Sequence, residues 1–346
     1  MRAFRCDHCG QLLFFENSQC LNCESQLGFV PSELELHALV GERADLKRCI
    51  NLELAQCNWI VEDENEALCQ ACITTKVRPA DGDTEGLVEF ANAESAKRRV
   101  LYQLLDIGLP VDQDTLSFEL RSSTSEAVTT GHSAGVVTLD LAESDAPQRE
   151  QRRQELGEAY RTMLGHFRHE LGHYYQPILL TSEEIWDQSR EVFGDERKDY
   201  QQAMDEHYAN GSPADWGDHF VSAYATMHPW EDWAETFAHY LHIRDTLQTA
   251  GDFGLEIKGP QVVSDHDDEF TAAPEPEAGE RGFAEIIDNW LPLTYALNQI
   301  NRSMGQPDLY PFALADDVIA KLSFMHDRFH AIETGAEAPA PPMDQE

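Results

Sequence analysis

Apolar residues in the middle of the chain recur at two different spacings, which predict a helix and two strands. Between Thr84 and Gly108 they lie three or four positions apart, as on one face of an α-helix, with Thr84 as the expected N-cap. Residues 114–121 and 135–141 instead alternate apolar and polar side chains, which is typical of β-strands. The pattern therefore favours an α+β protein.

Most of the later apolar positions also follow helical spacing. Helices are predicted over about 149–176, from 182 onwards, after Pro229, over 283–304 and from 316 to about 330. Residues 252–282 are rich in Asp, Glu, Pro and Gly, which predicts a mobile acidic insert, and 336–346 are expected to be a disordered tail. The catalytic part is thus expected to be mainly helical.

The chain is long enough for two domains, and the cysteines indicate where they divide. It has 346 residues, and its eight cysteines all lie between Cys6 and Cys72. A stretch containing Pro79 and Gly82 follows them and reads as a linker. We expect a small cysteine-rich domain at 1–80 and a larger domain at 81–335.

The cysteines form two groups of four, each suited to a tetrahedral zinc ion. The groups are Cys6, Cys9, Cys20 and Cys23, then Cys49, Cys57, Cys69 and Cys72. The first consists of two C-x-x-C pairs, whereas the second opens with a wider spacing. A disulfide framework is disfavoured by the expected location, and a redox dithiol would not need four cysteines in pairs. We predict two structural zinc ions in a double zinc-ribbon-like domain, which should supply much of its folding free energy.

The predicted helix at 149–176 carries the sequence His169-Glu170-Leu171-Gly172-His173. Two histidines four positions apart lie on one side of a helix, so both can reach one metal ion. The apolar stripe of this helix lies on a separate face and consists of Leu156, Tyr160, Met163, Phe167, Leu171 and Tyr174. We therefore interpret the histidines as zinc ligands rather than as surface or core histidines, and Glu170 as the base that takes a proton from water.

A second helix offers carboxylates that could complete the site. It begins after Pro229, and its apolar face contains Trp230, Trp233, Ala234, Phe237, Ala238 and Leu241. Glu231 and Glu235 lie one turn apart on it. A buried carboxylate is costly unless it is paired or bound to a metal, so one of the two could bind zinc while the other accepts a hydrogen bond from a ligand histidine. Without the histidine motif, two surface carboxylates would be the simpler interpretation.

These two stretches together resemble the gluzincin metallopeptidases. The resemblance implies that Glu231 is the third zinc ligand and that Glu235 orients a ligand histidine. Tyr224 matches the position of an oxyanion-stabilising tyrosine in the anthrax lethal factor branch of that clan. The metzincin alternative fails, because Gln176 stands where its motif requires glycine.

The similarity extends over nearly the whole chain, apart from the acidic insert and the tail. The cysteine-rich region together with RHELGHYY, HPWEDWAETFAHYL and NRSMGQPDLYPF is similar to a bacterial family of zinc-binding metallopeptidases with an N-terminal zinc ribbon. The resemblance implies a zincin-like peptidase fold. In such a protease the strand at 135–141 is a candidate for the edge strand that holds an extended peptide, although an ordinary core strand is an equal alternative.

Charge and hydropathy limit the partners and the location. The chain has 25 Lys and Arg against 63 Asp and Glu, a net charge of −38, and such a field repels the phosphates of nucleic acids. The N-terminus lacks the apolar region of a signal peptide, and no stretch is long and apolar enough to span a bilayer. We expect a cytoplasmic protein that binds neither nucleic acid nor membranes.

The sequence leaves two functional hypotheses. The first is a zinc-dependent peptidase or amide hydrolase with one catalytic and two structural zinc ions, acting on a peptide or protein. The second is an interaction or regulatory module that binds a protein partner through its zinc ribbons and retains a non-catalytic protease-like domain. The intact base and ligand set favour the first hypothesis.

Overall fold

The computed structural model describes residues 2–123, 128–144, 162–259, 271–275 and 282–340. These fall into two compact units. The ribbon–sheet unit contains the described residues from Ala3 to Asp187 and those from Ala331 onwards, and the helical unit contains those from Gln188 to His330. The ribbon–sheet unit runs across the domain boundary that the sequence predicts near residue 80.

The N-terminal part of the ribbon–sheet unit is built from short hairpins. β1 (Phe4–Arg5) pairs with β2 (Leu12–Leu13), and β3 (Leu27–Val30) pairs with β4 (Glu35–Ala38), both antiparallel. Two 3₁₀ turns (Gly41–Arg43 and Ile50–Leu52) and the short helix α1 (Gln70–Ile73) complete it. An aromatic core, made of Phe4, Phe15, Phe29 and Trp59, is buried among them. So small a core fits a region that depends on metal binding for its stability.

A four-stranded sheet follows, in the order β5-β6-β8-β7. Strands β5 (Thr75–Val77), β6 (Ser117–Arg121) and β8 (Val136–Asp140) are parallel, and β7 (Gly131–Ser133) pairs antiparallel with β8. The alternating apolar residues of β6 and β8 are fully buried, as their spacing predicts. However, β8 lies between β6 and β7, so the core-strand alternative for 135–141 holds, and β7 is the edge strand next to β8.

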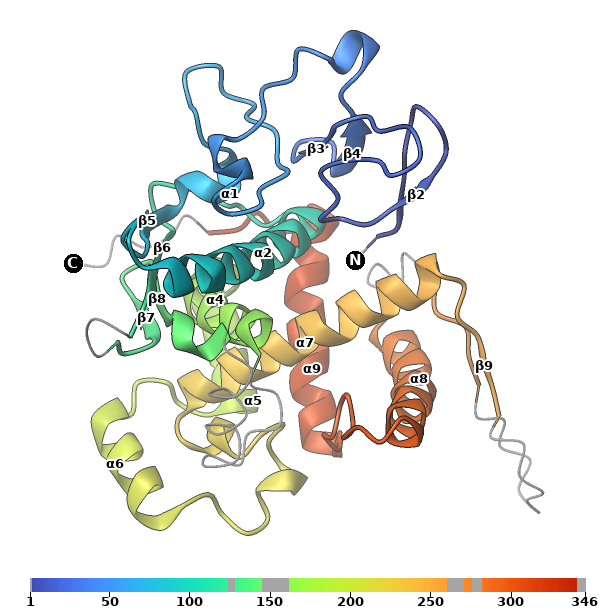
Figure 1. Cartoon of the computed structure of the whole chain (residues 1–346). Helices are drawn as coiled ribbons and strands as arrows, with labels where there is room; N and C mark the ends of the chain where they lie inside the picture. The colour runs from blue at the N-terminus through green and yellow to red at the C-terminus, as the bar shows by residue number, and fades with distance from the viewer. Residues whose placement is uncertain (1, 124–127, 145–161, 260–270, 276–281, 341–346) are drawn as a thin grey trace. The chain divides into compact units, whose positions relative to one another are not determined.

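Two long helices belong to the same unit, and Figure 1 shows them side by side next to the sheet: α2 (Thr84–Ile107) and α4 (Met163–Leu179). The N-cap of α2 is Asp83 rather than Thr84, since the Asp83 carboxylate accepts a hydrogen bond from the Gly86 backbone N–H. Gly108 ends α2 in the left-handed conformation. Residues 149–161 of the predicted histidine helix lie outside the described residues, and α4 extends to Leu179, beyond the predicted end at 176.

The helical unit contains α6 (Tyr200–Asn210), α7 (Pro229–Asp252), α8 (Phe283–Ser303) and most of α9 (Asp316–Glu333), while α5 (Glu183–Phe193) begins in the other unit. Two 3₁₀ turns, Trp216–Asp218 and Tyr224–Thr226, precede α7. The aromatic face of α7 is buried against α9, with the rings of Phe237 and Phe329 5.3 Å apart (Figure 1). These bounds agree closely with the helices that the sequence predicts.

The predicted acidic insert and tail lie partly outside the described residues. Within the insert, α7 continues to Asp252, and β9 (Ile257–Lys258) pairs antiparallel with β10 (Thr271–Ala272). Within the predicted tail, Glu337 accepts a hydrogen bond from the Thr181 hydroxyl, and the Ala340 N–H donates to the Ile178 carbonyl. These two contacts hold the first part of the predicted tail against the end of α4 and the residues that follow it.

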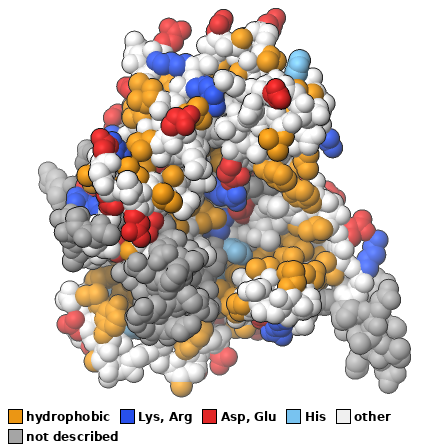
Figure 2. All heavy atoms as spheres, in the orientation of Figure 1, with side chains coloured by type: hydrophobic (Ala, Val, Ile, Leu, Met, Phe, Trp, Pro, Cys, Tyr) orange, Lys and Arg blue, Asp and Glu red, His pale blue; other side chains and the backbone are white. Residues whose placement is uncertain are grey.

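One face of the molecule shows how the acidic side chains are distributed. Figure 2 shows one face, on which acidic side chains are scattered among apolar and uncharged ones rather than gathered in one patch. Among the described residues, none of the helices has the length and hydropathy needed to cross a membrane.

The turn between β7 and β8 provides a test of the sheet. Gly135 has a φ of +76°, and a Cβ at this position would lie 2.0 Å from the Thr115 carbonyl oxygen. We expect Gly135→Ala to lower the free energy of unfolding by about 2 kcal/mol or more, since both the backbone and the neighbouring carbonyl must shift. Gly131→Ala is the matched control, because open space surrounds Gly131. Equal denaturant midpoints for the two variants would contradict this account of the turn.

Candidate metal centres

The first cysteine group has the geometry of a zinc ligand set. One sulfur from each of Cys6, Cys9, Cys20 and Cys23 lies within 4.8 Å of the others. The sulfurs of Cys6 and Cys23 are 3.8 Å apart, and those of Cys9 and Cys20 are 3.6 Å apart. A tetrahedral zinc with bonds of about 2.3 Å separates its sulfurs by about 3.8 Å, whereas a disulfide requires about 2.05 Å. The spacing therefore fits zinc and excludes disulfides between these pairs.

The second group is similar but fully buried. Cys49, Cys57, Cys69 and Cys72 again offer sulfurs within 4.8 Å of one another, and those of Cys57 and Cys69 are 3.5 Å apart. Two backbone N–H groups point at these sulfurs: that of Cys69 donates to Cys49, and that of Cys72 donates to Cys69, both at 3.4 Å. Such N–H groups stabilise thiolates, the ligand form that zinc requires.

The histidine pair lies on α4, which is held firmly within the ribbon–sheet unit. The Arg168 side chain donates to Gln103 of α2 at 3.1 Å, and the Tyr175 hydroxyl donates to the Pro110 carbonyl at 2.7 Å. The Phe167 ring packs edge-on against Phe118 of β6, with centroids 5.7 Å apart. Since these contacts lie on both sides of the motif, they fix the rotation of α4 about its axis.

This rotation places the histidines together. The rings of His169 and His173 are 4.9 Å apart, as expected for positions one turn apart. His173 and Glu170 are buried, and His169 is partly exposed. The α4 helix can therefore offer two imidazoles to one ion and places a carboxylate between them in sequence.

The sequence gives no signal for a third histidine near the pair. His132, on the edge strand β7, stacks on His173 with ring centroids 6.4 Å apart, and its Nε2 accepts a hydrogen bond from the Gly135 N–H. Burial, together with the neighbouring His173, lowers the pKa of His132 to about 4. His132 is consequently neutral at pH 7 and can accept this hydrogen bond.

Within the helical unit, the start of α7 carries the predicted carboxylates. Glu231 is buried, and the Tyr200 hydroxyl of α6 donates to its Oε1 at 2.9 Å. Glu235 is partly exposed and accepts a hydrogen bond from the Ser222 hydroxyl at 2.6 Å. Sequence reasoning missed Tyr200 and Ser222, because neither lies in a motif and Tyr200 is distant in sequence from the carboxylate that it contacts.

Tyr224 lies in the 3₁₀ turn before α7. Burial raises its pKa well above the usual range, and the nearby Glu231 carboxylate raises it further. Its hydroxyl therefore keeps its proton over the physiological range and can act as a hydrogen-bond donor.

The next residue of α7 forms an ion pair that the sequence did not predict. The carboxylate of Asp232 is fully buried and lies 2.7 Å from the Lys321 ammonium of α9. Burial raises the pKa of Asp232 to about 7, although Lys321 opposes the shift. This pair fixes the first turn of α7, and with it the backbone of Glu231, against α9.

Among the described residues, the histidines and the first carboxylate also form a group that could hold a metal ion. One nitrogen from each of His169 and His173 and one oxygen of Glu231 lie within 4.8 Å of one another. Two imidazoles and a carboxylate are a ligand set typical of catalytic zinc. The two cysteine groups and this group therefore all fit zinc by donor type.

Comparisons with known proteins place these residues in two matched regions. A family model described as "Putative zinc-binding metallo-peptidase" matches residues 86–328, and one described as a zinc-ribbon domain matches residues 3–83. Relatives from two strains of Mycobacterium tuberculosis and one of Mycobacterium bovis are each 51% identical over 334 residues, which is 94% of this chain and 94% of theirs. Each is named as an uncharacterized protein. No solved structure matches the chain.

The hydrogen bond from Tyr200 to Glu231 can be tested directly. We expect Tyr200→Phe to weaken zinc binding at the histidine site roughly 10-fold, the lower end of the effect of removing a residue that orients a ligand. Tyr208→Phe is the matched control, since Tyr208 lies on the same helix but is 68% exposed. Competition with a chelator measures the affinity. Equal affinities for the two variants would argue against a role for Tyr200 in orienting Glu231.

Proposed function

This chain belongs to the zinc-binding metallo-peptidase family, and we propose that it hydrolyses peptide bonds at a zinc ion held by His169, His173 and Glu231. The observation that carries the proposal is the grouping of these three ligand atoms beside a buried glutamate of the H-E-x-x-H motif. A zinc ion held by these three residues would lower the pKa of a water molecule to about 7 and would so supply hydroxide at neutral pH.

In the proposed mechanism, Glu170 is the general base and then the general acid. Its carboxylate accepts a proton from the attacking water and later transfers it to the leaving amine. Glu170 is buried on a fixed helix, so little reorientation is needed at each transfer.

Two tyrosines of the helical unit take complementary roles. Tyr200 orients Glu231 through its hydrogen bond to Oε1. Tyr224, which remains protonated, donates a hydrogen bond to the oxyanion that develops on the substrate carbonyl. Glu235 orients a ligand histidine in this mechanism. The hydrogen bond from the Ser222 hydroxyl fixes the Glu235 carboxylate for that role.

The substrate in this proposal is a peptide or protein that binds beside α4. The edge strand β7 contains His132 next to His173, and its outer backbone groups can pair with an extended segment. Strand β7 therefore takes the role that the sequence suggested for 135–141.

The central prediction concerns Glu170. We expect Glu170→Gln to keep its zinc and its fold but to lower kcat by about 100-fold or more, because the amide cannot take the proton. Cleavage of a complex peptide mixture, followed by mass spectrometry, measures the activity, and metal analysis measures the zinc.

Glu184→Gln provides the matched control, because it makes the same chemical change at an exposed residue of α5. It should cleave like the unmodified protein. If Glu170→Gln cleaves at the same rate as this control, Glu170 is not the base. If the unmodified protein with zinc cleaves none of the mixture, the peptidase proposal is wrong.

A further inference from the structure

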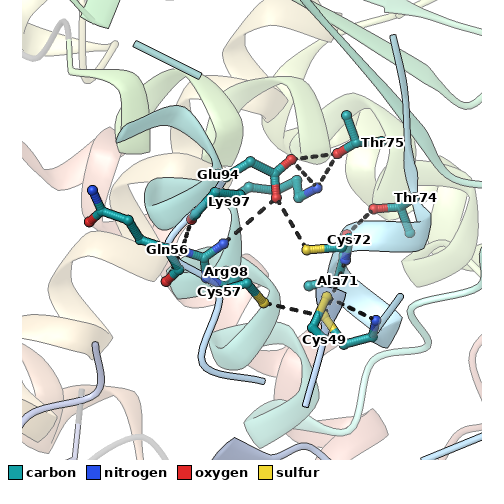
Figure 3. Close-up of polar contacts among 12 residues, drawn as sticks. Cys49, Gln56, Cys57, Ala71, Cys72, Thr74, Thr75, Glu94, Lys97 and Arg98 are labelled. Atoms are coloured by element: carbon teal, nitrogen blue, oxygen red, sulfur yellow. Dashed lines mark hydrogen bonds and ion pairs between the residues drawn. The ribbon is translucent and has the colours of Figure 1, made fainter. Parts of the chain in front are cut away.

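Three charged side chains of α2 are buried beside the second cysteine group (Figure 3). Glu94 and Lys97 are 0% exposed and Arg98 is 3% exposed. Charged residues are almost never buried so completely unless they have partners. α2 lies within the peptidase match, whereas the four cysteines lie within the zinc-ribbon match. The cluster therefore sits where the two matched regions meet inside one compact unit.

The three side chains hold one another and face the cysteines. Lys97 lies 2.7 Å from Glu94 Oε1 and also contacts the Thr75 hydroxyl. The other oxygen, Glu94 Oε2, lies 3.8 Å from both the Cys72 sulfur and the Arg98 guanidinium. Arg98 also donates to the Ala55 carbonyl, two residues before Cys57, at 2.9 Å. Figure 3 shows the cluster joining α2 to the segments that carry the cysteines.

The charges of this cluster complement a zinc site. A zinc ion with four thiolates has a net charge of −2, and a buried charge of this size is costly without compensation. Lys97 and Arg98 supply two positive charges next to it, and Glu94 fixes their positions. Without the metal, a buried cluster with a net positive charge would face thiols that no longer need compensation.

The helix that carries this cluster also contacts the ribbon and the histidine helix. Tyr102 of α2 enters the aromatic core of the ribbon, with ring centroids 5.2 Å from Phe15 and 5.7 Å from Phe29. The next residue, Gln103, accepts the hydrogen bond from Arg168, which precedes His169. A displacement of α2 caused by loss of the metal would therefore also displace residues that contact α4.

We propose that Glu94, Lys97 and Arg98 compensate the charge of a zinc ion at Cys49, Cys57, Cys69 and Cys72, and that occupancy of this site keeps α2 and the histidine helix α4 rigid. The zinc ribbon then stabilises the histidine helix and is not an independent domain. Whether α4 is also catalytic depends on the proposed function, but this support of α4 by the second cysteine site does not.

The test uses the full chain with zinc bound and replaces the lysine. We expect Lys97→Met to speed alkylation of the four second-site cysteines about tenfold or more, since residues that support metal ligands typically change metal affinity 10- to 100-fold. Deuterium uptake should rise in residues 84–107 and 163–179. Lys76→Met is the matched control, because it removes a positive charge four residues from Cys72 at an exposed position.

Two further variants distinguish a loss of charge compensation from a general destabilisation of the fold. Glu94→Gln keeps an oxygen that accepts from Lys97 and Thr75 but removes a negative charge facing the thiolates, so it should slow alkylation of the second-site cysteines. This opposite sign keeps the proposal testable even if Lys97→Met fails to fold. Cys9→Ser should empty the first cysteine site without changing deuterium uptake in 163–179, because the charged cluster of α2 contacts Cys72 of the second site.

The proposal is wrong if Lys97→Met behaves like Lys76→Met, or if Glu94→Gln speeds alkylation. It is also wrong if the second-site cysteines become reactive while deuterium uptake in 163–179 stays unchanged. Alkylation and deuterium uptake do not require turnover, so these results are independent of whether the chain cleaves peptides.

Discussion

The fixed rotation of α4 is the constraint on which the other features depend. Two imidazoles one turn apart can share an ion only if the helix that carries them cannot turn or slide. Its apolar face packs on the sheet through Phe167, and polar contacts from Arg168 and Tyr175 hold it at either side of the motif. The same packing leaves Glu170 buried beside the histidines, so one helix carries both candidate metal ligands and the proposed base.

At two places among the described residues, a buried ion pair supports a helix next to a candidate ligand. Glu94, Lys97 and Arg98 tie α2 to the second cysteine group, and Asp232 and Lys321 fix the turn of α7 that carries Glu231. Apolar residues of similar size would often be at least as stable at such positions. These buried charges are better explained by precise placement of the candidate ligands than by stability alone. A metal site is sensitive to small errors in the positions of its ligands.

Local patterns predicted much of the fold and the site. The family match confirms the resemblance, and the helices, the strands near 114–121 and 135–141 and both cysteine groups follow from spacing. The prediction failed where distant segments decide the outcome. The placement of β7 at the sheet edge, the Tyr200 hydroxyl on Glu231 and the position of His132 next to His173 depend on tertiary packing, which leaves no periodic signal. The domain boundary predicted near residue 80 lies close to where the two family matches divide, although Tyr102 of α2 packs into the ribbon core.

The proposed function rests on one zinc ion held by His169, His173 and Glu231. Crystallographic measurement of anomalous scattering at the zinc edge tests it most directly. The account predicts three zinc peaks per chain, one of them about 2.0–2.2 Å from a nitrogen of His169, a nitrogen of His173 and a carboxylate oxygen of Glu231. Peaks at the two cysteine groups alone, or a third peak that Glu231 does not reach, would contradict it.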